Sequence, residues 1–207
     1  MPAHRLGHIT ASTVSPILTG KGEKLLTGGI SYARKLAMER SGLVKIDPDQ
    51  YGFQGNRATE WGNENEAGAL ARYEAERFVD ITNQQKIAQM GEWVSCTPDG
   101  YVGSDGLVEA KCPFNPDKHW EYLVDSEALI SDYYDQVQFQ LMCTGRAYCD
   151  LISFDPRYTA PYDLVIVRIE PDKEWIERCL SRISQVDEVI EETLNIIEAS
   201  NLRGEAE

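Results

Sequence analysis

The stretch that most restricts the fold of this chain is "CTPDGYVGSDGLVEAKCPF", residues 96–114. Its Ser-Asp-Gly sequence is typical of a tight turn between two antiparallel strands, and short apolar segments stand on both sides of it. In the strand after the turn, successive side chains point to opposite faces of a sheet. Glu109 and Lys111 are therefore predicted to share one face of that sheet. Val108 and Ala110 are predicted to share the other.

The acidic residues of this stretch are predicted to have two kinds of role. Asp105 lies inside the Ser-Asp-Gly turn, where aspartate is expected for backbone reasons alone, so a structural role is predicted for it. Asp99 follows Pro98 near the preceding strand, from where it could reach Glu109 across the hairpin. Two carboxylates near the ammonium group of Lys111 are what Mg²⁺ and a water nucleophile need. A Glu-x-Lys pair alone is equally compatible with an ion pair on a solvated strand.

A helix is predicted over residues 56–78, which are rich in Ala, Glu and Arg. With a step of about 100° per residue, Glu66 falls on the same side as Leu70 and Tyr73. Glu64 lies nearly opposite. Glu66 is therefore predicted to turn toward the interior of the protein. An acid at the border of an apolar stripe can also be a surface residue whose head group reaches water.

A further helix is predicted at residues 126–144, and two glutamines flank its apolar stripe on opposite sides. Gln136 shares its side with Tyr133 and Gln140. Of Gln136 and Gln138, only one can therefore face a given site. Because glutamines on helix surfaces are commonly just solvated, the pattern leaves both a functional and a purely structural interpretation open.

The order of the predicted elements indicates the fold class. In chain order they are a helix at 31–41, the helix at 56–78, an antiparallel meander within 92–111, the helix at 126–144, strands at 147–155 and 163–170, and an amphipathic helix at about 171–199. This order predicts a mixed α/β (α+β) fold with a central mixed β-sheet flanked by helices. One domain is predicted for 1–207, with an N-terminal helical part at about 1–55, a core at 56–170 and a C-terminal helix and tail at 171–207.

The composition excludes several classes of protein. No apolar run approaches the roughly 18 to 20 residues that span a bilayer, and the first residues lack the apolar segment of a signal peptide. The five cysteines include no Cys-x-x-Cys pair, which argues against a disulfide framework, a zinc knuckle or an iron–sulfur cluster. A cytoplasmic protein with free, buried thiols and no membrane partner is predicted. The formal net charge of −14 counts, taken alone, against nucleic acid binding.

Several blocks of the sequence coincide in order and spacing with those of a known family. They are "RLGHITAS" at 5–12, "EWGNENE" at 60–66, "CTPDG" at 96–100, "VEAKCPF" at 108–114 and "DQVQFQ" at 135–140. Together they closely resemble the phage lambda exonuclease family, also called YqaJ-like viral recombinases, within the PD-(D/E)xK nuclease superfamily. The resemblance covers nearly the whole chain. It implies a restriction-endonuclease-like PD-(D/E)xK core.

The resemblance implies a role for the residues of the hairpin. The metal-binding aspartate of the family corresponds to Asp99, and its metal-binding glutamate corresponds to Glu109. Ala110 would offer its backbone carbonyl group to the metal. The catalytic lysine corresponds to Lys111. The cofactor implied is Mg²⁺, with Mn²⁺ in its place as an alternative, and one or two ions per site.

Further residues are matched outside the hairpin. The upstream helical glutamate of the family corresponds to Glu66, and its active-site glutamine corresponds to Gln136. The arginine and serine that help the family to hold the 5′-terminal phosphate correspond to Arg5 and Ser12. A serine of the same pocket is replaced here by Thr97, which keeps the hydroxyl group and adds a methyl group.

The resemblance implies a Mg²⁺-dependent, processive 5′ to 3′ exonuclease that acts on double-stranded DNA ends. Such an enzyme leaves 3′ single-strand overhangs and works with a single-strand annealing protein in phage-type recombination, in the cytoplasm of a bacterium that carries the phage or prophage. Hydrolysis by a metal-activated water is expected, with Lys111 orienting that water and Gln136 fixing the lysine or the water.

Members of the family are similar in forming a ring of three subunits that admits duplex DNA. A homotrimeric toroid of this kind would answer the objection raised by the negative net charge, because cations are needed only where DNA passes. The segment 21–45 is net basic and supplies candidate channel cations. It can equally be a solvated helix face and loop.

Other functions remain to be separated from the exonuclease. An endonuclease of the same superfamily, of the restriction or repair type, would use the same residues and would cut covalently closed circles. A nuclease-like fold retained for DNA binding is expected only where a metal ligand is lost, and none is lost here. A glycosidase with Glu66 and Glu109 as paired acids would leave Asp99 and Lys111 unexplained.

Overall fold

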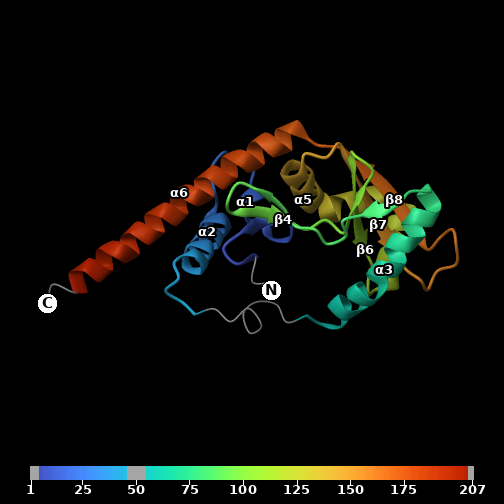
Figure 1. Ribbon diagram of the computed structural model, residues 1–207, viewed down its shortest axis with the longest axis horizontal. Coiled ribbons are helices and arrows are strands. Elements are labelled where there is room, and N and C mark those ends of the chain that lie inside the picture. The colour runs from blue at the N-terminus through green and yellow to red at the C-terminus, as the bar shows by residue number, and fades with distance from the viewer. Residues whose placement is uncertain (1–4, 46–54, 205–207) are drawn as a thin grey trace. The chain divides into compact units, whose positions relative to one another are not determined.

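The structure, a computed structural model, describes residues 5–45 and 55–204, and side chains up to residue 200 (Figure 1). Backbone contacts divide the chain into two compact units. The first unit comprises residues 1–54, 91–94 and 172–207, and the second comprises residues 55–90 and 95–171. Of the predicted site residues, Arg5 and Ser12 belong to the first unit. The others belong to the second.

The second unit is built on a five-stranded sheet with the strand order β2-β5-β6-β7-β8. Its strands are β2 (Ile81–Thr82), β5 (Gly100–Val102), β6 (Gly106–Lys111), β7 (Tyr148–Phe154) and β8 (Leu164–Ile169). β6 and β7 run parallel, and the other neighbouring pairs are antiparallel. A parallel pair needs a long crossover, which α4 (Pro116–Val124) and α5 (Ser126–Thr144) supply. The predicted central mixed sheet flanked by helices is confirmed.

Helices cover both faces of this sheet (Figure 1). One core cluster joins α3 (Arg57–Arg77) to the sheet and contains Ala69, Leu70, Tyr73, Val102, Val108, Ile152 and Phe154. The other joins α4 and α5 to the opposite face and contains Tyr101, Leu107, Tyr122, Leu129, Val137, Leu141, Cys149, Leu151 and Ile169. Leu107 and Val108 lie in different clusters, as the alternation of a strand requires. β6 is therefore covered on both faces.

Capping residues determine where the two helices of the site begin and end. The side chain of Asn56 accepts hydrogen bonds from the first turn of α3, and Phe78 ends that helix in the left-handed conformation. Asp125 caps α5 in the same way, and Gly145, with φ +66°, ends it. The predicted helix at 126–144 is confirmed, and the one at 56–78 is confirmed to within a residue at each end.

The predicted helix at 31–41 begins too late. α2 spans Thr27–Arg40, so it includes two glycines that disfavour a helix on propensity alone. The structure supplies the reason. A Cβ atom on Gly29 would lie 3.3 Å from the carbonyl oxygen of Pro16 and 3.5 Å from the Cα of Ile17. A side chain at this position would crowd Pro16, so the close packing of α2 against this segment favours glycine.

The predicted meander is wrong in one connection. β4 (Val94–Cys96) pairs with β3 (Ala88–Met90), and the neighbour of β5 on that side is β2. The segment between β4 and β5 contains Pro98, which has no amide hydrogen to donate to a ladder. The elements β1, β2, β3 and α1 are two to four residues long, which is too short to show a hydrophobic period.

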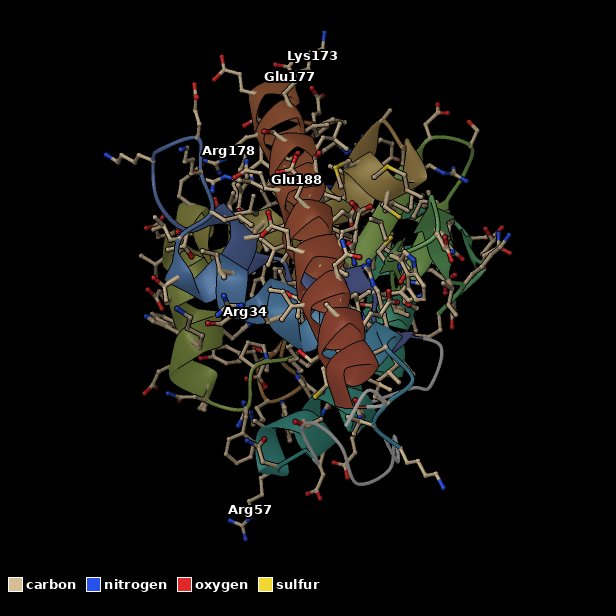
Figure 2. The ribbon with its side chains drawn as sticks, turned by 90° about the vertical axis from the view of Figure 1, so that its left-hand side faces the viewer. Arg34, Arg57, Lys173, Glu177, Arg178 and Glu188 are labelled. Carbon is tan, nitrogen blue, oxygen red and sulfur yellow. The ribbon has the colours of Figure 1, made fainter. Side chains whose placement is uncertain are left out.

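The first unit contains β1 (Ile9–Thr10), a 3₁₀ turn (Ala11–Thr13), α1 (Ser15–Leu18), α2 and the long helix α6 (Lys173–Gly204). α6 confirms the predicted C-terminal helix and extends beyond residue 199. Glu177, Arg178 and Glu188 are exposed along it (Figure 2), whereas Trp175 and Cys179 are buried. The helix is therefore amphipathic, as predicted.

Two further sequence predictions concern membranes and thiols. Along the described residues, no helix is long and apolar enough to cross a membrane. The five cysteines, all within the described residues, form no disulfide; Cys96, Cys149 and Cys179 are buried, and Cys112 and Cys143 are half-buried.

The packing of α5 against the sheet leads to a prediction about stability. Leu129 is 0% exposed in the α5 cluster, so Leu129→Ala is expected to lower the free energy of unfolding by about 2–5 kcal/mol. Urea denaturation followed by circular dichroism measures this change. Val124→Ala is the matched control, because its side chain is 73% exposed. It is expected to change the free energy by less than about 0.5 kcal/mol, and equal effects would contradict the packing.

Candidate active site

The site begins where β5 separates from β6. The last paired residues of the two strands are Gly100 and Val108. Beyond them, the N–H of Ala110 donates to Oδ2 of Asp99 at 2.8 Å. The N–H and C=O groups of one residue in an extended strand point to the same edge of that strand. The carbonyl group of Ala110 is therefore directed to the side on which Asp99 lies.

Gly100 allows the strands to approach closely at this point. A Cβ atom on Gly100 would collide with the side chain of Ile81 on β2 and would lie 3.1 Å from Cγ1 of Val108 on β6. A larger residue fits here only if the side chain of Ile81 or β2 itself moves. The glycine that follows Asp99 in the sequence therefore helps to hold that aspartate beside β6.

Glu109 and Lys111 lie on one face of β6, as predicted. Nζ of Lys111 donates to Oε1 of Glu109 at 2.8 Å and lies 4.7 Å from the ring centroid of Tyr133 on α5. Val108 and Ala110 belong to the α3 cluster on the opposite face. The predicted alternation is confirmed, and the acid and the base both point toward α5.

Two glutamines of α5 hold the Glu109 carboxylate. Gln136 donates to Oε1 of Glu109 and accepts a hydrogen bond from Lys111 at 3.2 Å. Gln140 donates to Oε2 of Glu109 at 2.8 Å. Gln138 points elsewhere and donates to a backbone carbonyl group. The predicted division of these glutamines is confirmed. Sequence reasoning gave Gln140 no role, although its spacing of four residues from Gln136 placed it on the same side.

A third glutamine connects two acids. Glu66 on α3 is half-buried, and Glu64 is exposed, as predicted. Nε2 of Gln85 donates to Oε1 of Glu66 at 2.7 Å and to Oδ1 of Asp99 at 3.3 Å. Sequence reasoning missed Gln85. It lies in the turn between β2 and β3 with φ +55°, and a left-handed glutamine has no sequence signal.

The site holds an excess of negative charge. Burial, together with the charges of Glu109 and Glu66, raises the pKa of Asp99 to about 8, although the N–H of Ala110 and the charge of Lys111 act against this. Burial alone would lower the pKa of Lys111, but the charge and hydrogen bond of Glu109 raise it. The site therefore contains three carboxyl groups and one ammonium group, and a bound cation would relieve the repulsion among the acids.

The donor atoms fit a hard divalent cation that also binds water and phosphate. Among the residues that the structure describes, no three His, Cys, Asp or Glu side chains form a cluster that would hold a metal by themselves. Mg²⁺ commonly uses one or two carboxylates and completes its shell with water and substrate phosphate. Asp99, Glu109 and the carbonyl group of Ala110 match this chemistry. Oε1 of Gln140 is a buried acceptor beside them, without a hydrogen-bond partner among the described residues.

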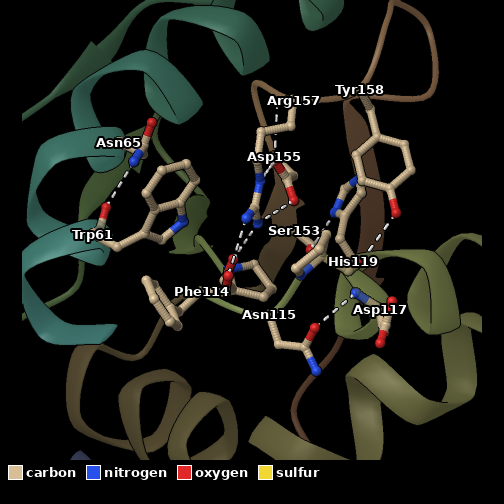
Figure 3. A network of polar contacts seen from close by, with 12 residues as sticks. Trp61, Asn65, Phe114, Asn115, Asp117, His119, Ser153, Asp155, Arg157 and Tyr158 are labelled. Atoms are coloured by element: carbon tan, nitrogen blue, oxygen red, sulfur yellow. Dashed lines mark hydrogen bonds and ion pairs between the residues drawn. The ribbon is translucent and has the colours of Figure 1, made fainter. Parts of the chain in front are cut away.

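An arginine holds the segment that follows β6 (Figure 3). The guanidinium group of Arg157 pairs with the buried carboxylate of Asp155 at 2.6 Å. It also donates to the carbonyl groups of Pro113 and Phe114, at 3.1 Å each. Its Cζ atom lies 4.4 Å from the ring centroid of Trp61 on α3. Arg157 therefore connects the end of β7, the segment after β6 and the beginning of α3.

The residues predicted to hold a 5′-phosphate lie in both units. In the first unit, Arg5 donates to the hydroxyl group of Ser12 at 3.4 Å. Arg5 also lines a small cavity together with His8 and Lys35. Thr97 is half-buried in the second unit.

The structural role predicted for Asp105 agrees with its contacts. Its carbonyl oxygen accepts a hydrogen bond from the N–H of Ala147 at 2.8 Å, immediately before β7. The turn therefore also helps to align the parallel strand next to β6.

Comparisons with known proteins identify a family and similar structures. The model of the YqaJ-like viral recombinase domain family matches residues 2–147. An alkaline exonuclease, LHK-Exo, from Laribacter hongkongensis is 28% identical with a TM-score of 0.80, over 97% of this chain and 96% of that chain. The structure of the same enzyme in complex with dAMP is 28% identical with a TM-score of 0.78, over 96% of this chain and 95% of that chain.

A more distant structure is similar in fold. A phage-related exonuclease from Haemophilus somnus 129PT is 17% identical with a TM-score of 0.74, over 92% of this chain and 96% of that chain. A search of curated proteins finds no match.

The bond between Gln140 and Glu109 leads to a prediction about stability. Gln140→Met is expected to lower the free energy of unfolding of the metal-free protein by about 1–3 kcal/mol, because a buried carboxylate oxygen loses its donor. In a Glu109→Gln background, the same substitution should cost less, because the acceptor is no longer charged. Urea denaturation of the four proteins in EDTA measures the coupling. An equal cost in both backgrounds would refute a specific bond.

Proposed function

We propose, from the premise that this chain belongs to the YqaJ-like viral recombinase domain family, that it is an exonuclease that hydrolyses one strand of duplex DNA from the 5′ end. The family match confirms the resemblance predicted from the sequence blocks. The main support for the activity is the convergence of Asp99, Glu109 and Lys111 at the point where β5 leaves β6. The similar alkaline exonuclease, which has been crystallised with dAMP, supports a nucleotide as product.

Mg²⁺, or Mn²⁺ in its place, is the proposed cofactor, with one or two ions per site. Asp99, Glu109 and the carbonyl group of Ala110 would hold it. The N–H of Ala110 bonds to Oδ2 of Asp99, so Oδ1, which contacts Gln85, is the oxygen proposed for the cation. When bound, the cation supplies positive charge against the scissile phosphate and lowers the pKa of water.

The remaining residues orient the reacting groups and donate hydrogen bonds to them. The raised pKa of Lys111 keeps its ammonium group protonated at neutral pH, so it acts as a hydrogen-bond donor that orients the attacking water and offsets charge on the phosphate. Gln136 fixes the position of Lys111, and Gln140 fixes that of Glu109. Glu66 adds a carboxylate on the side of Asp99 and completes the proposed catalytic set.

Arg5 and Ser12 are proposed to hold the 5′-terminal phosphate of the substrate strand. An arginine suits this task because its planar guanidinium group matches phosphate geometry. The family resemblance also assigns the hydroxyl group of Thr97 to the phosphate pocket, and this assignment stays a prediction.

The wider assembly is part of the same proposal. The proposed assembly is a homotrimeric toroid that encloses duplex DNA. It digests DNA processively, leaves 3′ overhangs, and transfers the product to a single-strand annealing protein in the bacterial cytoplasm. Exposed cations that could line the DNA channel are Lys21, Lys24, Arg34, Lys35 and Lys45. They support the proposal because a ring needs positive charge only along its inner surface.

One experiment tests both the role of Lys111 and the proposed exonuclease activity. With Mg²⁺, the protein is expected to degrade 5′-phosphorylated linear duplex and to leave covalently closed circles intact. Lys111→Ala should lower kcat by about 100-fold or more, because a donor to the reacting groups is lost. Lys173→Ala, at an exposed position on α6 (Figure 2), is the control and should retain wild-type turnover. Normal turnover by Lys111→Ala would refute its role, and cutting of circles would identify an endonuclease.

The role of Arg5 is tested by comparing initial rates on 5′-phosphorylated and 5′-hydroxyl duplex. The wild-type protein is expected to prefer the phosphorylated end by about tenfold, the effect of a charge-assisted hydrogen bond. Arg5→Ala should bring this ratio close to one by slowing only the phosphorylated substrate. Arg178→Ala, an exposed arginine of α6, should preserve the ratio. A preference that survives in Arg5→Ala would place the phosphate contact elsewhere.

A further inference from the structure

Gln85 is held near the acids by an unusual turn. Asn83 and Gln85 have φ values of +50° and +55°, in a region that residues other than glycine rarely adopt. A hydrogen bond of 3.1 Å from the N–H of Lys86 to the carbonyl group of Asn83 closes the turn. Such backbone conformations persist where the surrounding structure requires them, commonly at functional sites. Here the turn directs an otherwise exposed side chain onto two carboxylates.

The amide nitrogen of Gln85 contacts one oxygen of each acid. It lies 2.7 Å from Oε1 of Glu66 and 3.3 Å from Oδ1 of Asp99. A carboxylate oxygen accepts hydrogen bonds, so the amide presents its NH₂ group to Oε1 of Glu66 and reaches Oδ1 of Asp99 with the same group. A hydrogen-bond donor thus lies between two carboxyl groups, one from α3 and one from the segment before β5.

The contact falls on the oxygen of Asp99 that a metal ion would need. Oδ2 is taken by the N–H of Ala110, which leaves Oδ1 for a cation, and Gln85 is bonded to that atom. One or two ions are proposed per site, and an ion shared by Asp99 and Glu66 would have to take the place of the amide nitrogen. Gln85 and such a cation therefore cannot occupy this position together.

We propose that Gln85 is an internal competitor of the metal ion: its amide holds Glu66 and Asp99 in the metal-free protein and is displaced when a divalent cation binds. This inference rests on the proposed function, because it adds to that same site a residue that sets its metal affinity. The amide satisfies an acceptor oxygen of each carboxyl group, and each oxygen would otherwise face the other acid. The amide therefore stabilises the metal-free site, and its exposed position lets it turn into water when the cation arrives.

A different role for Gln85 predicts the opposite result. If the amide rotated and bound the cation through Oε1, removing it would weaken metal binding, because an oxygen ligand would be lost. If it competes with the cation, removing it strengthens metal binding. The sign of the change in metal affinity therefore separates a competitor from a ligand. An unchanged affinity would rule out both roles.

Isothermal titration calorimetry of Mn²⁺ and Mg²⁺ into the metal-free protein, without DNA, measures this sign. Gln85→Ala is expected to tighten Mn²⁺ binding by about three- to tenfold, the effect of removing a hydrogen bond to a charged group at an exposed position. Gln85→Asn should act in the same direction, because asparagine tolerates the left-handed conformation but has a shorter side chain. Gln84→Ala, at an exposed position of the same turn, is the matched control and should leave the affinity unchanged.

The outcomes distinguish this inference from the function on which it rests. If Mn²⁺ binds the wild-type protein, and both Gln85 variants bind it equally well or more weakly, the competitor role is wrong and the proposed function stands. If neither ion binds the wild-type protein, the metal chemistry of the proposed function is wrong, and the role of Gln85 fails with it. Tighter binding by both variants, with Gln84→Ala unchanged, is the expected result.

Discussion

The hydrogen bond from the N–H of Ala110 to Asp99 is the contact on which the site depends. It lies where β5 stops pairing with β6, so it takes the place of a ladder hydrogen bond. The half-buried N–H of Ala110 loses its strand partner here, and a side-chain acceptor in its place offsets the cost of the lost bond. The Asp99 carboxylate is that acceptor. The same side chain therefore ends the strand pairing and offers its second oxygen to a cation beside Glu109.

The carboxyl groups of the site are held chiefly by amides. Gln136 and Gln140 bond to Glu109, and Gln85 bonds to Glu66 and Asp99. An amide satisfies a carboxylate as a hydrogen-bond donor without cancelling its charge, whereas arginine or lysine would cancel it. Apart from the ion pair of Lys111 with Glu109, this arrangement fixes the positions of the acids without cancelling their negative potential. That combination suits a site that must bind a divalent cation reversibly.

Local rules predicted the parts of the site that lie within single elements. The shared face of Glu109 and Lys111 follows from the alternation of a strand, and the side of Gln136 follows from helical periodicity. The contacts that join different elements could not be predicted in this way. Gln85 reaches the acids only through a left-handed turn, and Gln140 gains its role only because α5 packs against β6. Both depend on tertiary packing, as does the pairing of β5 with β2 instead of β4.

The acidity of the site bears on how a chain of net charge −14 could act on DNA. In the metal-free protein, the site contains the carboxyl groups of Glu66, Asp99 and Glu109 and a single ammonium group, so it repels phosphate. A divalent cation reverses that local potential. Phosphate and cation should therefore bind cooperatively at this position, each raising the affinity for the other by the same factor. Cations elsewhere, such as those exposed in segment 21–45, would then attract DNA in general, while the catalytic position accepts a phosphate only once its metal is bound.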